Sequence, residues 1–173
     1  DVARIVGRFP EDEDQLTIQQ AGDWVDIELM KAIEKKYTGA QITKDMVRRW
    51  KEKSSYVGGK VKEVLVDLSV EGKSQRVDIG DLLENACDEL AQHLGVAVKR
   101  IISTGDPEYQ PLFRKNVYLA GGSSQIKGLA AKVTEYISDI GDVSVSAVKK
   151  PEHKVAEGAL ALAESMPDEE YTS

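Results

Sequence analysis

The sequence predicts an α/β fold, with a mixed sheet flanked by helices and a small α+β lobe inserted between the larger elements. Short segments of alternating polar and apolar residues mark strands near both ends of the chain, and apolar stripes at i, i+3 and i+4 mark helices. A second strand pair at residues 60–79 is too small to stand alone and needs a helix to pack on. The predicted order is two strands and a helix, the lobe, a long helix, and then strand, helix, strand and helix.

The first two strands are predicted to form a hairpin. Residues 2–6 and 15–20 read as its strands, while residues 8–14 contain a proline and four consecutive acids, which do not suit a strand interior. Such an acidic turn is consistent with a cation or partner site, but we interpret it as a solvated hairpin tip. Asp23 follows as the predicted N-cap of a helix that runs to about Lys36 and carries one apolar face.

The inserted lobe combines a basic helix with a second hairpin. The helix is predicted to start at Thr43 or Asp45 and to run to about Ser55. Its lysines and arginines are consistent either with a solvated face or with contact to a nucleotide. Residues 60–70 and 75–79 are the expected strands of the hairpin.

The longest helix is predicted after the lobe. Apolar residues step by three or four positions from Leu83 through Cys87 to Ile101, which gives a single apolar stripe. Cys87 lies on that stripe, so we expect it to be a small buried hydrophobe and not a reactive thiol. The helix should end at Asp106-Pro107, because proline disfavours a helical conformation in the residue before it.

The last third of the chain is predicted to alternate strands and helices. A strand at residues 117–120 precedes a helix at 124–140, and a strand at 142–148 precedes a helix at 153–166. Residues 167–173 read as an acidic, frayed tail. The last helix is expected to bury one face, which consists of Val155, Ala159, Leu162 and Met166.

Composition excludes several classes of function. The net charge of −7 over 173 residues argues against non-specific nucleic-acid binding, which needs a basic surface. No apolar run reaches the roughly 20 residues that a transmembrane helix needs. The single cysteine excludes an internal disulfide framework and fits a reducing cytoplasm. The two histidines lie far apart in sequence, so no metal site is predicted.

The clearest functional motif is the strand that ends in Gly121-Gly122. A glycine pair before a helix lets the backbone approach a phosphorylated ligand, and the helix N-terminus then faces that ligand. The motif is not a P-loop, a dinucleotide-binding fingerprint or a nucleophile elbow, because the required spacings are absent. Taken alone, it indicates either a nucleotide or anion site or a plain strand-to-helix turn.

Three motifs in one order resemble the actin-like ATPase superfamily, which has a ribonuclease H-like fold. Residues 117–123 resemble its adenosine motif, residues 21–26 its Gly-containing signature with a final acid, and residues 48–55 the helix that covers the nucleoside. Residues 107–110, 121–131 and 158–167, and the first hairpin with its acidic turn, are similar to the magnetosome-associated bacterial actins in particular. The sequence departs from the superfamily at Arg48, where an acid is frequent, and at Ser123, where bacterial actins commonly carry a third glycine.

The resemblance implies an arrangement of subdomains and a nucleotide site. Residues 1–37 and 80–173 would form subdomain IIA, and residues 38–79 the inserted subdomain IIB. The implied cofactor is ATP or ADP with Mg²⁺. Gly121, Gly122 and Ser123 would meet the α-phosphate and ribose, Lys51 and Ser55 would flank the adenosine, Gly22 would line the cleft, and Asp1 would lie near the metal and phosphates.

The resemblance covers only the second half of such a protein. The chain is therefore expected to be part of a longer protein, to lack most of the phosphate loops and all catalytic residues, and to be inactive as an ATPase alone. The implied parent is a cytoplasmic, cytoskeletal protein that self-associates into filaments, with magnetosome or membrane-associated adaptor proteins as further partners.

Two other functions remain open at this point. A sugar kinase of the same superfamily would need a substrate pocket, but no insertion that could form one is visible. A non-enzymatic interaction module would keep the fold as a scaffold around a decayed nucleotide site, as Arg48 and Ser123 would allow. Filament formation with ATP, or phosphorylation of sugars, would discriminate between the three.

Overall fold

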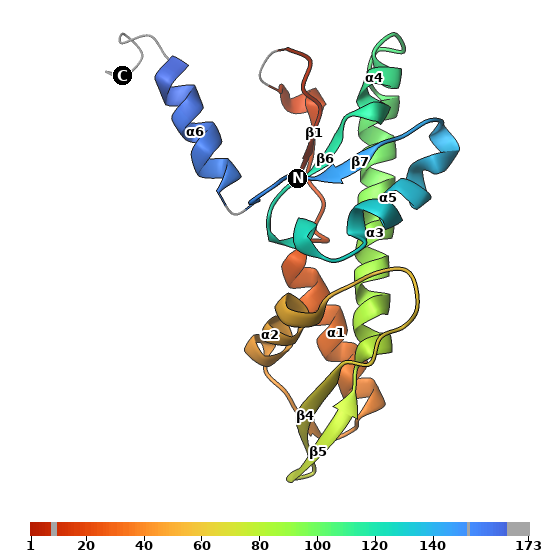
Figure 1. The fold of residues 1–173 in the computed structure, drawn as a ribbon, viewed down its shortest axis with the longest axis vertical. Coiled ribbons are helices and arrows are strands. Elements are labelled where there is room, and N and C mark those ends of the chain that lie inside the picture. The colour runs from red at the N-terminus through yellow and green to blue at the C-terminus, as the bar shows by residue number, and fades with distance from the viewer. Residues whose placement is uncertain (8–9, 152, 166–173) are drawn as a thin grey trace.

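The computed structural model describes residues 1–7, 10–151 and 153–165, and the helix α3 (Gly80–Ser103) runs along most of its length (Figure 1). The apolar stripe predicted for this helix is confirmed, because Leu83, Cys87 and Ile101 are all buried. The helix continues through Gly95, where a Cβ atom would lie 2.9 Å from the Cβ of Tyr136. A glycine at this position therefore lets a neighbouring helix pack closely against α3.

The first hairpin is present but shorter than predicted. Strand β1 (Val2–Ala3) pairs antiparallel with β2 (Gln15–Leu16), after a 3-10 turn η1 (Asp12–Asp14). The prediction of a solvated tip is wrong for Asp14, which is buried against Arg4 with their atoms Oδ1 and Nη2 2.6 Å apart. Arg4 Nη1 also donates to the carbonyl of Ile101, so this ion pair attaches the hairpin to the end of α3.

Helix α1 (Gly22–Lys36) begins before the predicted cap. Its N-cap is Ala21, so Asp23 lies within the first turn, and the prediction of Asp23 as N-cap is wrong. The helix buries Val25, Leu29 and Ile33 against α3, which confirms the predicted apolar face.

The small lobe contains three antiparallel strands and one helix. Strands β4 (Leu65–Val70) and β5 (Lys73–Asp78) form the predicted hairpin, and the short strand β3 (Ala40–Gln41), which was not predicted, pairs with β4. Helix α2 (Lys44–Ser54) is capped by Thr43, whose hydroxyl accepts from the amide of Met46. Strand β4 starts five residues later than the predicted strand at residue 60, because residues 58–64 form a loop.

The glycine motif leads into a broken helix. Strand β6 (Val117–Leu119) is followed by the 3-10 turn η2 (Gly122–Gln125), helix α5 (Leu129–Ile137) and the 3-10 turn η3 (Ser138–Ile140). The predicted helix at 124–140 is thus three pieces, and Gly128, which adopts the left-handed φ of +88°, separates the first piece from the second. The Cβ of any other residue there would lie 2.1 Å from the carbonyl oxygen of Val57, so this glycine permits close contact with the lobe.

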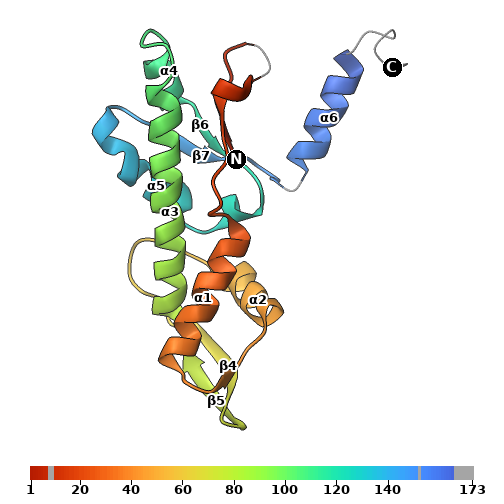
Figure 2. The ribbon, with the colours of Figure 1, turned by 180° about the vertical axis from the view of Figure 1, so that it is seen from behind.

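The body of the molecule contains two separate two-stranded sheets. Strand β6 pairs parallel with β7 (Val145–Ala147), after the short helix α4 (Gln110–Lys115), while β1 pairs with β2. Helices α3 and α5 pack together and support both pairs (Figure 2). The two pairs are mixed in direction, as the sequence predicts.

Helix α6 (Lys154–Ser165) lies apart from the rest of the molecule in both views (Figures 1 and 2). The predicted burial of its apolar face is not observed, since Leu160 and Leu162 are exposed and Ala159 is too. The prediction for Met166 and for the tail at 167–173 lies outside the described residues. In the described ranges, no helix has both the length and the apolarity to cross a membrane.

Candidate functional site

A cavity of about 640 Å³ lies where the start of α1, helix α2 and the glycine turn η2 meet. Helix α1 contributes its first turn, α2 contributes one face, and η2 contributes open backbone. The walls are Ala21, Gly22, Asp23, Arg48, Lys51, Glu52, Ser55, Gly122, Ser123, Gln125 and Ile126.

The N-terminus of α1 forms one wall of this cavity. The first backbone N–H groups of a helix have no partner inside it, and the helix dipole places partial positive charge there. Gly22 lies at this point, and a Cβ atom on it would be 3.0 Å from Ser123 Oγ and 3.6 Å from Lys51 Nζ. Glycine therefore lets helix α1, Lys51 and the glycine turn approach one another.

Two residues of helix α1 hold the side chain of Lys51 in place. Its ammonium donates to the carbonyl of Gly22 at 2.8 Å and lies 2.7 Å from Oδ1 of Asp26. Asp26 is 0% exposed, and within the described part of the chain its oxygens accept no well-directed hydrogen bond. The close contact with Lys51 is thus an ion pair, which orients the ammonium while leaving it at the cavity wall with 12% of its side chain exposed.

Arg48 joins the same charge network. Its Nη2 lies 3.1 Å from Asp23 Oδ1, and its Nε lies 3.5 Å from Asp26 Oδ2. The pKa of Asp23 is lowered by a hydrogen bond from Lys44, by the positive charge of Lys44 and by the charge of Arg48. The negative charge of Asp23 in turn raises the pKa of Arg48. Asp23 therefore stays ionised beside the cavity and fixes two basic side chains of α2.

The glycine turn presents backbone to the cavity. Gly121 has a φ of +79°, which only glycine adopts readily, and no atom lies within 4 Å of a Cβ built at Gly121 or Gly122. The buried Ser124 closes the turn, because its hydroxyl and its amide both bond to the carbonyl of Gly121, at 2.7 and 3.1 Å. The open side of the turn can accept a ligand without a steric conflict.

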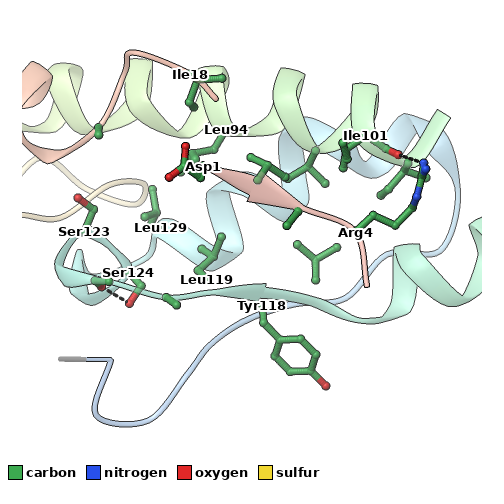
Figure 3. Close-up of a pocket in the computed structure, with 18 of the residues that line it drawn as sticks. Asp1, Arg4, Ile18, Leu94, Ile101, Tyr118, Leu119, Ser123, Ser124 and Leu129 are labelled. Carbon is green, nitrogen blue, oxygen red and sulfur yellow. Dashed lines mark hydrogen bonds between the residues drawn. The ribbon is translucent and has the colours of Figure 1, made fainter. Parts of the chain in front are cut away.

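Most of the predicted site residues meet at this cavity. Gly22, Lys51 and Ser55 approach it from one side, and Gly122 and Ser123 from the other. The structure places the two remaining residues, Gly121 and Asp1, along an adjoining groove, which Gly122 and Ser123 also line (Figure 3). The Asp1 carboxylate accepts a hydrogen bond from the hydroxyl of Thr17 at 2.8 Å.

Sequence analysis missed two polar residues of the cavity, Glu52 and Gln125. Glu52 lies four residues after Arg48 on α2, so helical spacing alone would have placed it on the same face. Gln125 could not have been found in this way, because the predicted helix at 124–140 is a 3-10 turn at that point.

The metal-ligating side chains and the one cysteine also bear on the chemistry of the described residues. Over the described ranges, no three His, Cys, Asp or Glu side chains gather in a way that could hold a metal ion. Cys87 is buried, as predicted, and desolvation raises the pKa of its thiol to about 12. A thiol with that pKa stays protonated at neutral pH and is a poor nucleophile.

Comparison with known proteins finds relatives over nearly the whole chain. The family model described as MreB/Mbl protein matches residues 14–170. The actin-like protein MamK of Paramagnetospirillum magneticum is 34% identical over 167 residues, and the actin-like protein MamK of Magnetospirillum gryphiswaldense is 32% identical over 167 residues. These matches cover 96% of this chain but 48% and 46% of the relatives, so the chain spans about half their length.

Solved structures give the same result at the level of the fold. A MamK double helical filament superposes with a TM-score of 0.88, at 34% identity over 93% of this chain and 50% of that one. A non-polymerising MamK mutant bound to AMPPNP superposes with a TM-score of 0.85, at 33% identity over 94% of this chain and 50% of that one.

Proposed function

Since this chain belongs to the MreB/Mbl family and has the actin-like fold that its sequence predicts, we propose that it forms one wall of a cleft that binds ATP or ADP. The observation that carries this proposal is the convergence of a helix N-terminus, an oriented ammonium and open glycine backbone on one cavity. The volume of this cavity, about 640 Å³, lies within the range of about 300–1,000 Å³ that small-molecule sites occupy.

The residues present fit a nucleotide. The N–H groups at the start of α1 and along the glycine turn suit phosphate oxygens, because both offer donors without a side chain in the way. Lys51 in the last turn of α2 and Ser55, the residue that caps this helix, would flank the adenosine, with Glu52 available for a ribose hydroxyl. Asp26 has the role of a positioning residue, since it fixes the ammonium of Lys51.

Bound ATP would supply a phosphoanhydride bond, and Mg²⁺ would neutralise its phosphate oxygens. Mg²⁺ usually takes one or two carboxylates together with phosphates and water, and Asp1 is the carboxylate that we propose near it. Phosphoryl transfer requires groups on both sides of the nucleotide to be positioned together. Because this chain offers one wall only, we expect it to show no magnesium-dependent ATP turnover alone.

We extend the proposal to assembly on the basis of its relatives. Two of the similar structures are filaments of MamK. We propose that a longer protein containing this chain self-associates into cytoskeletal filaments and serves magnetosome chains through adaptor proteins. Pelleting of such a protein with ATP, without phosphorylation of a sugar panel, would favour this function over the sugar-kinase and scaffold alternatives.

The nucleotide proposal can be tested in a chimera in which this chain replaces the matching segment of the Paramagnetospirillum magneticum MamK. Lys51→Ala should weaken the binding of a fluorescent ADP analogue by about ten- to a hundredfold, because a charge-assisted hydrogen bond contributes about 1.5–3 kcal/mol. Lys53→Ala is the matched control, since Lys53 is exposed on the same helix and does not line the cavity. Equal affinities of both variants and the parent would contradict the proposed site.

A further inference from the structure

Four side chains of alternating charge form a row that runs from the solvent to the wall of the proposed nucleotide cavity. In order, the members of this charge row are Asp23, Arg48, Asp26 and Lys51, with contacts of 3.1, 3.5 and 2.7 Å between successive members. We infer that Arg48 is a positioning residue, which acts as a second counter-ion of Asp26 and thereby frees Lys51 to bind the ligand. This role rests on the proposed nucleotide site, although the effect of Arg48 on Lys51 can be measured without nucleotide.

The spacing of the four residues on two helices produces the charge row. Asp23 and Asp26 are three residues apart on α1, and Arg48 and Lys51 are three residues apart on α2. Residues three apart lie on the same face of a helix, so each helix presents two like charges to the other. The packing of α1 against α2 interleaves the two pairs, and the charge of Asp26 therefore lies between two positive charges.

Asp26 requires a positive charge beside it at all times. Its carboxylate is 0% exposed, and among the described residues its ion-pair partners are Arg48 and Lys51. A buried carboxylate that loses its counter-charge is strongly destabilising. A ligand that draws the ammonium of Lys51 towards itself must offset that cost, unless a second cation stays beside the carboxylate.

Lys51 has to serve both the fold and the ligand. An ammonium group has three N–H donors, and the carbonyl of Gly22 accepts from one of them at 2.8 Å. The nitrogen also lies 2.7 Å from Oδ1 of Asp26. A polar atom of the ligand therefore competes with Asp26 for the remaining charge of the ammonium. The strength of this competition depends on how far another cation already neutralises Asp26.

Arg48 can neutralise Asp26 without occupying the cavity. Its Nε lies 3.5 Å from Oδ2 of Asp26, whereas Lys51 contacts Oδ1, so the two cations take different oxygens of one carboxylate. Its Nη2 donates to Oδ1 of Asp23 at 3.1 Å. The two acids of α1 thus fix the guanidinium at both of these atoms. We therefore assign Arg48 to Asp26 and not to direct contact with the ligand.

The balance of charge at the cavity leads to the same role. Among the described residues, the charged side chains of the cavity wall and their ion-pair partners are three acids and three bases. They are Asp23, Asp26, Glu52, Lys44, Arg48 and Lys51. Without Arg48 the negative charges are in excess, and like charges repel, so such a wall opposes the phosphates of a nucleotide.

The effect of Arg48 on Lys51 can be measured in the nucleotide-free chimera by the rate at which N-hydroxysuccinimide acetate acylates Lys51. Arg48→Gln should slow this reaction about threefold or more, because only the neutral amine reacts and the undivided charge of Asp26 favours the ammonium. Tandem mass spectrometry gives the rate at each lysine, and Lys53 is the internal reference, since it is exposed on the same helix. Loss of the fold would speed the reaction instead, so unfolding cannot imitate the expected result. An unchanged or faster rate at Lys51 would overturn the role of Arg48.

Nucleotide binding by the chimera tests whether Arg48 acts through Asp26. Arg48→Gln should weaken the binding of the fluorescent ADP analogue about fivefold or more, because the cavity wall becomes negative. Lys44→Gln is the matched control and should weaken it less than about twofold, since Lys44 forms an exposed ion pair with Asp23 and does not line the cavity. In an Asp26→Asn background, Arg48→Gln should have no further effect.

The outcomes separate the role of Arg48 from the proposed function. Equal effects of Arg48→Gln with and without Asp26 would overturn the inference, because Arg48 would then contact the ligand directly. Equal effects of Arg48→Gln and Lys44→Gln would overturn it too. A parent chimera that binds no nucleotide would contradict the proposed function, and the acylation rates would still decide whether Arg48 controls Lys51.

Discussion

At the scale of single residues, the position of Lys51 depends on a carboxylate that solvent does not reach. Asp26 lies on the first turns of α1, and Lys51 lies on α2, so their ion pair joins two elements across the edge of the cavity. Taking a charge out of water is costly unless an opposite charge compensates it. The burial of the Asp26 carboxylate is therefore tolerated only while a basic residue of α2 stays beside it.

We predict that Asp26→Asn lowers the free energy of unfolding by about 3 kcal/mol, because it leaves the largely buried ammonium of Lys51 without its counter-charge. Urea denaturation of the 173-residue chain measures the effect. Asp23→Asn is the control, since Asp23 forms exposed ion pairs with Lys44 and Arg48 and its loss should change stability little. Equal losses of stability in both variants would contradict the proposal that the ion pair of Asp26 and Lys51 joins α1 and α2.

Residue patterns predicted burial better when the cause was local. The spacing of Leu83, Cys87 and Ile101 predicted the buried stripe of α3 correctly, because helical periodicity depends only on residues in adjacent turns. The burial of Asp14 was missed, because its cause is Arg4, ten residues away, together with the end of α3. Composition around Asp14 is uniformly acidic and carries no sign of that partner.

At the scale of elements, the lobe is attached to α3 by Asp78. Its Oδ1 accepts hydrogen bonds from the amides of Val64 and Gly80, at 2.8 and 2.9 Å, so one carboxylate links the hairpin to the start of the helix. These two backbone hydrogen bonds, the Val64 bond foremost, lower the pKa of Asp78 below its ordinary value of 3.8.

This arrangement predicts a dependence of stability on pH. Because the folded state lowers the pKa of Asp78, the ionised form stabilises the fold at pH values above the unfolded pKa of 3.8. That contribution is lost as the pH falls through the lower, folded pKa. Thermal unfolding should therefore show a smaller loss of stability between about pH 5 and pH 3 in Asp78→Asn than in the parent. Parallel pH profiles for the two proteins would contradict this role.

Gly128 determines how closely α5 approaches the lobe. The amide of Val57 donates to the carbonyl of Lys127 at 2.8 Å, and Tyr56 forms a parallel bridge with Lys127. Only a residue without a side chain allows this approach, given the 2.1 Å between a Cβ at position 128 and the Val57 oxygen.

We predict that Gly128→Ala destabilises the chain well beyond the cost of its backbone conformation. Gly58→Ala is the matched control, because Gly58 has a φ of +78° but no atom within 4 Å of its Cβ. The control should lose about 1–2 kcal/mol, the usual cost of a left-handed conformation for a residue with a side chain. Denaturant unfolding of both variants measures the difference, and similar losses would show that the contact with Val57 is unimportant.

At the scale of the whole molecule, two neighbouring cavities share the glycine turn. One cavity gathers charged side chains and helix N-terminal backbone, and the other is an apolar groove between two open strand edges. Sequence motifs predicted several residues of the first, such as Gly122 and Lys51, because a glycine pair after a strand and a lysine on a lobe helix are local features. The groove could not be predicted, since it arises from the separation of β1–β2 from β6–β7.

The arrangement of α6 was also beyond prediction from the sequence. Its pattern predicted an inward face, but helical spacing states only which residues share a face and not what covers them. Leu160 and Leu162 remain exposed in the structure. The surface that would cover the apolar face of α6 therefore cannot be predicted from the sequence of the helix alone.

The central claim is that the cavity between α1, α2 and the glycine turn holds the adenosine and phosphate groups of a nucleotide. The most direct measurement is a crystal structure of the chimera with AMPPNP and Mg²⁺. We predict that the adenosine lies beside Lys51 and Ser55, with a phosphate at the backbone of Gly121 and Gly122. Nucleotide bound at another place, or an ordered complex in which Lys51 and the glycine turn make no contact with it, would contradict this site.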